Sequence, residues 1–238
     1  MREKIELLKE YIENSNNIVF FGGAGVSTES GIPDFRSAGG LYNENYKYPP
    51  ERMLSHSFFM TNTGEFFDFY KTKMLFLGAK PNAAHLKLAE LEREGKLTAV
   101  ITQNVDNLHQ MAGSKNVFEL HGSVYRNFCM DCEKEHEIED ITASIGVARC
   151  ECGGIIKPDV VLYEEGLDEK TVSGAIAAIE NADVLIVGGT SLAVYPAAGL
   201  INYYKGNKLV LINKSETPMD DRANLVIHES IGEVLSMV

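Results

Sequence analysis

Short apolar runs alternate with amphipathic segments along most of this chain. Runs rich in β-branched residues predict strands at 18–21, 98–102, 117–120, 159–163, 183–188, 208–212 and 225–227. Apolar residues at helical spacing predict helices at 2–15, 64–77, 82–94, 104–111, 168–180, 196–204 and 230–237. Several strands are apolar on both faces, as buried parallel strands are. The pattern therefore predicts an α/β fold with a Rossmann-like, doubly wound parallel sheet.

Two segments interrupt this alternation. Residues 37–80 contain many aromatic residues and paired glycines and prolines, and we expect them to form a helical insertion. Residues 126–156 contain all the cysteines, and we expect a metal-binding insertion. The large domain would comprise 1–36, 81–125 and 157–238, and the two insertions would form a smaller domain. Ligands of such sheets bind at the carboxyl ends of the strands, so the residues that follow predicted strands are the candidates for a site.

The four cysteines are clustered and spaced as C-x2-C followed by C-x-C: Cys129, Cys132, Cys150 and Cys152. We find no export signal in the sequence, so this clustering favours a metal over disulfides. Four thiolates suit a closed tetrahedral zinc site, whose role would be structural because no position is open to a substrate. The C-x-C spacing is tighter than the usual C-x2-C, so we expect the second half-site to differ in geometry.

The net charge and the hydropathy of the chain limit the classes of partner that it can bind. The net charge is −12, which repels phosphate backbones and tolerates basic peptides. The first segment is charged and amphipathic, and no run of apolar residues is long enough to span a membrane. We therefore expect a cytoplasmic monomer with no direct nucleic-acid or membrane partner.

The segment GGAGVSTESGIPDFR, residues 22–36, follows the first predicted strand. Gly22, Gly23 and Gly25 allow positive φ angles and close approach of a pyrophosphate, and a helix beginning near 24–27 would direct N–H groups at it. The usual dehydrogenase fingerprint also has a third glycine and an acidic residue about 20 positions further on. That pattern is incomplete here, so hydride transfer is disfavoured. A purely structural glycine turn remains an alternative for this segment alone.

Polar residues follow other predicted strands as well. The segment TQNVDNLH follows 98–102, and the segments at Thr190 and Asn213 follow two later strands. His121 ends a short strand, where a histidine can act as a general base near neutral pH. Each segment alone also fits a structural role, such as a helix N-cap at Asn104 or Asp106. Their convergence on one edge of the sheet favours a shared ligand.

In chain order, GAGVSTESGIPDFR, TQNVDNLH, ELHGS, the cysteine quartet, KPDVV, GGTSLAVYPAA and LVLIN together resemble the sirtuins, which are NAD-dependent protein deacylases. The resemblance covers essentially the whole chain and is closest to the bacterial branch. It implies NAD consumed as a co-substrate and one structural zinc ion. It also implies protein lysine deacetylation, in which the acetyl group of acetyl-lysine passes to ADP-ribose and nicotinamide is released.

The resemblance further implies residue roles. His121 would be the catalytic base, Asn104 would take part in catalysis, and Phe35 would shield the reacting ribose carbon from water. The expected cofactor-binding residues are Gly23, Ala24, Gly25, Thr28, Asp34, Phe35, Arg36, Gln103, Asn104, Val105, Asp106, Gly189, Thr190, Ser191, Asn213 and Ile231. The expected peptide-binding residues are Val161, Leu162 and Tyr163.

The chain departs from the sirtuin pattern where the peptide should bind by strand addition, between 161–165 and 192–195. The common Phe-Gly-Glu is replaced by Tyr163-Glu164-Glu165, and we expect the added charge of Glu164 to favour basic peptides. The Tyr-x-x-Arg pair of desuccinylase-like sirtuins is replaced by Tyr70 and Lys73. We therefore expect short neutral acyl groups, acetyl first.

Three alternatives compete with deacetylation. ADP-ribosyl transfer to protein would use the same fold and cofactor, and His121 argues for deacetylation instead. A non-catalytic NAD or ADP-ribose sensor is disfavoured because both His121 and Asn104 are present. A zinc-ribbon nucleic-acid module is disfavoured by the net charge of −12.

Overall fold

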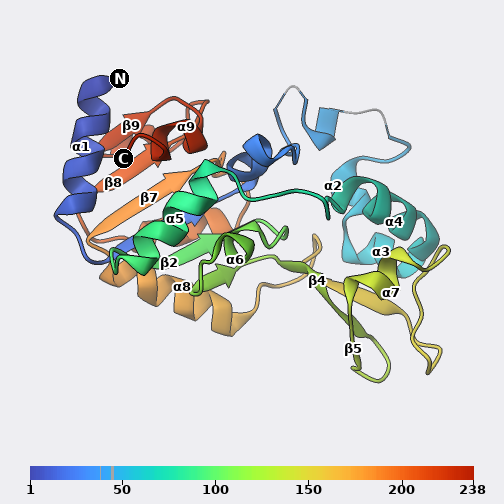
Figure 1. The fold of residues 1–238 in the computed structure, drawn as a ribbon. Helices are drawn as coiled ribbons and strands as arrows, with labels where there is room; N and C mark the ends of the chain where they lie inside the picture. Colours follow the sequence, from blue (N-terminus) through green and yellow to red (C-terminus); the bar gives the residue numbers. More distant parts are fainter. Residues whose placement is uncertain (38, 44–45) are drawn as a thin grey trace.

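A six-stranded parallel sheet forms the larger part of the molecule (Figure 1). The computed structural model describes residues 1–37, 39–43 and 46–238. The strand order is β3-β2-β1-β7-β8-β9. The strands are β1 (Ile18–Gly22), β2 (Leu97–Thr102), β3 (Val117–Glu119), β7 (Val184–Gly188), β8 (Leu209–Ile212) and β9 (Leu225–Ile227). The order reverses between β1 and β7, which makes the loops after these two strands the topological switch point.

Helices cover both faces of this sheet. They are α1 (Arg2–Glu13), α5 (Ala83–Arg93), α6 (Leu108–Ala112), α8 (Glu169–Asn181), α9 (Ile231–Leu235) and a 3-10 helix (Ala197–Tyr203). Ile18 and Phe20 of β1 enter a core with α1, α5 and α9. Val19 and Phe21 enter the opposite core with α8 and the 3-10 helix. Alternate residues of β1 thus pack into two cores, which explains the apolar character of both faces and confirms the predicted fold class.

The smaller part combines two segments that are distant in the sequence and lie side by side (Figure 1). One contains a three-stranded antiparallel sheet, ordered β5-β4-β6. Its elements are β4 (Gly122–Cys129), β5 (Glu135–His136), α7 (Ile138–Thr142) and β6 (Ile156–Val160). The other is helical, with α2 (Pro50–Met53), α3 (His56–Thr61), α4 (Thr63–Phe69) and a π-helical turn (Tyr70–Met74). The two segments share one hydrophobic core.

Aromatic rings fill much of this core. Phe66 contacts Phe59 and Phe67 edge-on, with ring centroids 4.9 Å and 5.7 Å apart. Tyr70 stacks on Phe66 at 5.7 Å and is fully buried. Its hydroxyl has no hydrogen-bond partner among the described residues. The aromatic residues of the helical insertion thus pack on one another within the core that the two segments share.

The expected strand at 159–163 is placed differently. Strand β6 spans Ile156–Val160 and pairs antiparallel with β4 in the small sheet. Gly122 has φ 75°, and a Cβ at this position would collide with the carbonyl oxygen of Asp159. This close approach lets β4 and β6 pair, and an apolar pattern alone does not say which sheet a strand joins.

Two expected helices also have different bounds. Helix α6 begins at Leu108 rather than at 104, because the Asp106 carboxylate accepts a hydrogen bond from the Leu108 N–H and holds the preceding residues in a turn. The expected helix at 64–77 is α4 followed by the π-helical turn. The predicted domain boundaries at 125 and 157 fall inside β4 and β6, and their exact place stays a prediction. Residues 38, 44 and 45 of the predicted insertion lie outside the described residues.

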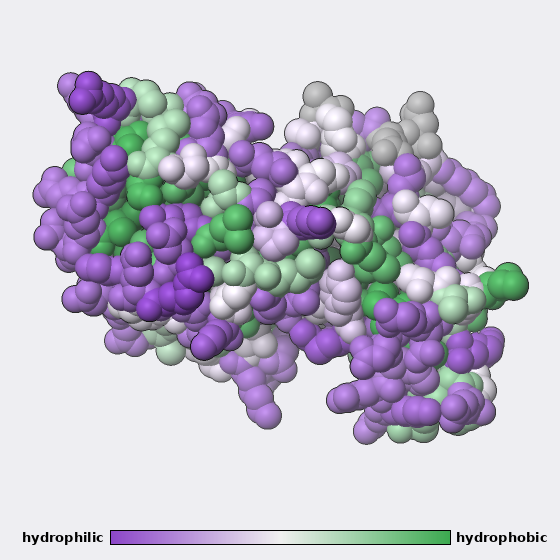
Figure 2. Space-filling model, viewed as in Figure 1, coloured by the Kyte–Doolittle hydropathy of each residue, from purple (hydrophilic) through white to green (hydrophobic). Residues whose placement is uncertain are grey.

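Hydrophilic residues cover most of the face seen in Figure 2, and apolar residues gather in patches across its middle. This distribution accords with a charged content of 24%, ordinary for a globular protein, and a net charge of −12. None of the helices in the described part of the chain is long and apolar enough to cross a bilayer.

Two buried histidines lie between α5 and α6. The ring centroids of His85 and His109 are 4.7 Å apart. His85 Nδ1 accepts a hydrogen bond from the Asn82 N–H, whereas both ring nitrogens of His109 lack a partner among the described residues. Burial lowers the pKa of His85 to about 4. Burial and the neighbouring His85 lower the pKa of His109 well below its ordinary value.

We predict that acid destabilises the protein through these histidines. Below pH about 6.5 the unfolded chain binds protons that the folded chain excludes, so the free energy of unfolding falls as the pH drops from about 6.5 towards 4. Each group contributes at most about 1.4 kcal/mol per pH unit. Urea unfolding at pH 7.5 and 5.5 should show a smaller loss of stability in His109→Phe than in the wild type. Equal losses would contradict the prediction.

Candidate active site

A cavity of about 660 Å³ lies where the carboxyl ends of the parallel strands meet the smaller part. Loops after β1, β2, β3, β7, β8 and β9 line it together with the segment that follows β6. The structure brings into this one cavity His121 and every residue expected to bind the cofactor or the peptide. The cysteines do not line it.

The glycine loop after β1 packs directly on the loop after β7. The Gly25 N–H donates to the Gly189 carbonyl oxygen at 2.8 Å. A Cβ on Gly25 would lie 2.8 Å from Gly189 Cα, and one on Gly23 would lie 2.8 Å from Thr190 Cβ. The chain then forms a 3-10 helix, Ala24–Ser30.

Gly23 and Gly25 were expected to allow positive φ angles, and the structure gives them a different role. Gly23 has φ −134°, and the glycine with positive φ in this contact is Gly189, at 58°. Gly23 and Gly25 are therefore needed for close packing of the two loops rather than for a left-handed conformation.

A buried polar network joins the loops after β1 and β2. Ser27 Oγ donates to Asp106 Oδ2 at 2.6 Å, and Asn104 Nδ2 donates to Ser27 Oγ at 3.0 Å. Burial raises the pKa of Asp106, although the hydrogen bonds from Ser27 and the Leu108 N–H oppose this. Sequence reasoning missed Ser27. The available signal was a hydroxyl residue in the turn directly after the glycines.

Gln103 connects the same edge to the loop after β7. Its Nε2 donates to Thr190 Oγ1 at 3.1 Å, and Thr190 Oγ1 also accepts from the Leu192 N–H at 3.2 Å. The Gln103 N–H donates to the Gly22 carbonyl at 3.0 Å. The loops after β1, β2 and β7 are thus tied to one another around the switch point.

The backbone fixes the tautomer of His121. Nδ1 lies 2.9 Å from the Gln103 carbonyl oxygen, which can only accept, so Nδ1 carries the proton. In the neutral ring Nε2 then holds the free lone pair. Burial lowers the pKa of His121, and the bond to the Gln103 carbonyl only partly offsets this. The ring is therefore neutral at physiological pH and able to accept a proton.

The segment after β6 is anchored to the smaller part. The Tyr163 N–H donates to the Leu54 carbonyl, and the His56 N–H donates to the Tyr163 carbonyl, both at 2.9 Å. The Glu165 carboxylate accepts from the buried Lys157 Nζ at 3.2 Å and from the Leu162 N–H at 2.8 Å. The anchoring roles of Lys157 and Glu165 were not predicted.

Glu164 adopts a conformation that suits glycine, with φ 76°. This accords with the glycine that sirtuins commonly have at this position. Its carboxylate accepts hydrogen bonds from the Ser57 N–H at 2.8 Å and from Ser57 Oγ at 2.6 Å, and these bonds lower the pKa of Glu164. The charge is thus held at the first turn of α3. The expected preference for basic peptides stays a prediction.

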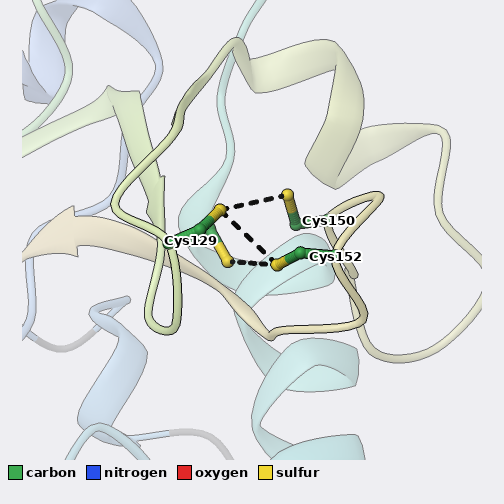
Figure 3. A group of neighbouring side chains, drawn as sticks. Cys129, Cys150 and Cys152 are labelled. Carbon is green, nitrogen blue, oxygen red and sulfur yellow. Dashed lines mark hydrogen bonds between the residues drawn. The ribbon is translucent and has the colours of Figure 1, made fainter.

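The four cysteine sulfurs lie within 4.8 Å of one another, and the labelled side chains in Figure 3 point toward a common centre. The Sγ atoms of Cys129 and Cys152 are 3.4 Å apart, and those of Cys132 and Cys150 are 3.7 Å apart. These separations are too long for disulfides and close to the spacing of about 3.8 Å that tetrahedral Zn–S bonds of about 2.3 Å require. The donor set therefore fits zinc.

The C-x-C half-site closes through a glycine turn. The Gly153 N–H donates to the Cys150 carbonyl, the Cys150 N–H donates to the Gly154 carbonyl, and Gly153 has φ 93°. A Cβ on Gly154 would lie 2.6 Å from Cys129 Sγ. The tighter spacing thus still brings both sulfurs into the cluster, and the metal would join the turn after β4 to the turn before β6.

We predict about one zinc ion per chain by inductively coupled plasma mass spectrometry. Cys132→Ser should lose the metal and lower the unfolding temperature by several degrees, because the two turns lose their link. Ile145→Ala, a change to a fully exposed side chain of the same region, is the matched control. Full zinc content and unchanged stability in the cysteine variant would refute this assignment.

Comparison with known proteins agrees with this geometry. The sequence profile of the Sir2 family matches residues 23–196. An NAD-dependent protein deacetylase of Clostridium perfringens is 64% identical, covering 100% of this chain and 99% of the relative. An NAD-dependent protein deacetylase of Clostridium acetobutylicum is 61% identical, covering 99% of this chain and 98% of the relative.

Solved structures agree as well. Sir2 with a deacetylated p53 peptide and 3'-O-acetyl-ADP-ribose has a TM-score of 0.91 at 41% identity, covering 98% of this chain and 96% of that one. Sir2 with a p53 peptide and NAD+ has a TM-score of 0.87 at 41% identity, covering 98% and 95%. The chain belongs to the Sir2 family, the sirtuins.

Proposed function

We propose that this protein is an NAD-dependent protein lysine deacetylase that transfers the acetyl group of acetyl-lysine to ADP-ribose and releases nicotinamide. The observation that carries the proposal is a cavity that the switch-point loops, a neutral and partly buried histidine and the segment after β6 line together. Its volume of about 660 Å³ lies in the range of cofactor sites. The relatives at 61% and 64% identity are named for the same activity.

The residues of the cavity suggest how NAD would be held. Thr190, Ser191 and Asn213 would bind the adenosine half, with Ile231 against the adenine. Gln103, Asn104 and Asp106 would bind the nicotinamide half. When bound, NAD supplies a ribose carbon that accepts the acyl oxygen and a nicotinamide group that leaves. Asn104 and Asp106 are already held by Ser27, so little reorganisation is needed on binding.

His121 would act as the general base, through Nε2, on a ribose hydroxyl. The Gln103 carbonyl fixes the tautomer that this role requires. Phe35 lines the same cavity and would exclude water from the reacting carbon. The zinc site is separate from these residues, and its proposed role is structural.

The acyl group is proposed to be short and neutral. Apolar side chains, including Val105, Val124 and Leu162, line the cavity beside the segment after β6. Tyr70 stands at the tyrosine position of the Tyr-x-x-Arg pair of desuccinylase-like sirtuins. It is fully buried in the aromatic core and does not line the cavity. Lys73, the second member of the pair, lines the cavity and lies over the Tyr46 ring. A carboxylate tail would therefore lack the tyrosine–arginine pair, which favours acetyl over succinyl.

We further propose a cytoplasmic monomer that acts on acetylated proteins. The N–H groups of Val161, Leu162 and Tyr163 already donate within the protein, so peptide pairing would use the remaining backbone groups of this segment and those of 192–195. We also propose the predicted division of the chain into a large domain and a smaller domain that is formed by the two insertions. ADP-ribosyl transfer to protein remains the second candidate, because it would use the same cofactor residues.

We predict NAD-dependent loss of acetyl from an acetyl-lysine peptide, with formation of O-acetyl-ADP-ribose, in a mass-spectrometric assay. His121→Ala should lower kcat/KM by about 100-fold or more, because the proposed base is lost. A succinyl-lysine peptide should give much less product. Wild-type zinc content and unfolding temperature of the variant serve as controls for folding. Consumption of NAD with the acetyl group retained would instead favour ADP-ribosyl transfer or NAD hydrolysis.

A second prediction concerns pH. Protonation of His121 removes the base, so kcat/KM should fall as the pH drops through the pKa of this residue. Because burial lowers that pKa, the acid limb should lie below the ordinary histidine value of about 6.5. Initial rates with an acetyl-lysine peptide between pH 5 and 9, corrected for any loss of folded protein, measure this. An acid limb centred above 6.5 would speak against His121 as the base.

A further inference from the structure

Two tyrosines form a hydrogen bond between segments to which we assign different ligands. The hydroxyl oxygens of Tyr42 and Tyr163 are 2.6 Å apart, and both residues line the cavity. Tyr163 belongs to the proposed peptide segment. Tyr42 lies in the chain that follows Phe35, which is proposed to cover the nicotinamide end.

Tyr42 is coupled to Phe35 by backbone and ring contacts. Its N–H donates to the Phe35 carbonyl at 2.8 Å, and the Leu41 N–H donates to the Asp34 carbonyl at 2.9 Å. The Tyr42 ring meets the Phe35 ring edge-on at 5.4 Å, and the Arg36 guanidinium lies 5.4 Å from the same ring. A displacement of Tyr42 would therefore carry the Phe35 segment with it.

Tyr163 is held on the opposite side. Its backbone forms a parallel bridge with Ser55, through hydrogen bonds to Leu54 and from His56. Glu165, two residues on, is fixed by Lys157 and the Leu162 N–H. The Tyr163 backbone is thus fixed by its neighbours. Among the hydrogen bonds of the described residues, the Tyr163 hydroxyl contacts only that of Tyr42.

We propose that the Tyr42–Tyr163 hydrogen bond couples the binding of NAD to the binding of the acetyl-lysine peptide. This inference rests on the proposed function. A peptide that packs against the Tyr163 side chain restrains its hydroxyl and, through the hydrogen bond, Tyr42 and Phe35. NAD then binds to a segment that has less conformational freedom to lose. The two tyrosines act as positioning residues and need not touch the reacting atoms.

Two observations support this reading. Burial and the bond to Tyr163 raise the pKa of Tyr42, so its hydroxyl stays protonated and remains available as a donor. Sirtuins with the common Phe-Gly-Glu have phenylalanine at the position of Tyr163 and lack its hydroxyl. The hydroxyl pair is therefore a feature of the Tyr163-Glu164-Glu165 sequence of this chain.

The test measures the affinity of the full-length protein for ADP-ribose by calorimetry, with and without an acetyl-lysine peptide. Tyr42→Phe, Tyr163→Phe and the double variant each remove hydroxyls and keep the rings. Tyr203→Phe, which changes a half-exposed tyrosine outside the cavity, is the matched control. Peptide should raise the affinity for ADP-ribose in the wild type and in the control.

Each single variant should lose about three- to tenfold of that enhancement, as expected for one hydrogen bond, and the double variant should lose no more than either single one. The KM for NAD at saturating peptide should rise by a similar factor, with a smaller change in kcat.

Two results would overturn the inference. If the wild type binds both ligands and the single variants keep its full enhancement, or if their effects add in the double variant, the hydroxyl pair is not the link and the proposed function stands. If the wild type binds no ADP-ribose and deacetylates no peptide in the presence of NAD, both the inference and the proposed function fail.

Discussion

The contact between the loops after β1 and β7 is the constraint on which the site depends. At this switch point the backbone of Gly25 lies against that of Gly189, closely enough that a side chain on either would displace the other. With no Cβ atoms between them, the two loops form one continuous surface. The side chains of Gln103 and Thr190 then meet across it at 3.1 Å. The polar groups of three loops are thereby placed at one edge of the sheet before any ligand binds.

The smaller part completes this edge rather than forming a site of its own. Its aromatic core joins the helical segment to the antiparallel sheet, and the cysteine cluster ties together the two turns at the far end of that sheet. Strand β4 leaves the larger part directly after His121, and β6 returns towards it before Val161. The proposed base and the proposed peptide segment are therefore adjacent, and the Val161 N–H donates to the His121 carbonyl at 3.0 Å.

Charge and burial act together around His121. A carboxylate next to the imidazole would raise its pKa and hold the proton, whereas the Gln103 carbonyl orients the ring without adding a charge. Asp106, an acidic residue that lines the same cavity, is held by Ser27 and the Leu108 N–H. The cavity thus holds a neutral imidazole, the proposed base, and a carboxylate whose hydrogen bonds are already made within the protein.

The sequence by itself determined the fold class, the sirtuin family and the set of residues that share one cavity. The fold class follows from local patterns, namely two-sided apolar strands with polar residues directly after them, and the parallel sheet collects all strand ends at one edge. The family and most of the expected site residues were implied by the resemblance of the motifs to those of sirtuins. The match to the Sir2 family confirms the family, whereas the individual roles of the site residues stay predictions.

Tertiary structure alone decided what depends on contacts between distant segments. It placed 156–160 in the small sheet, and it showed that Gly23 and Gly25 are needed for close packing against the loop after β7. It also turned the Glu164 carboxylate toward Ser57 and brought Tyr42 to Tyr163. Local periodicity holds no information about such pairs, because each is set by how two separately folded segments pack against each other.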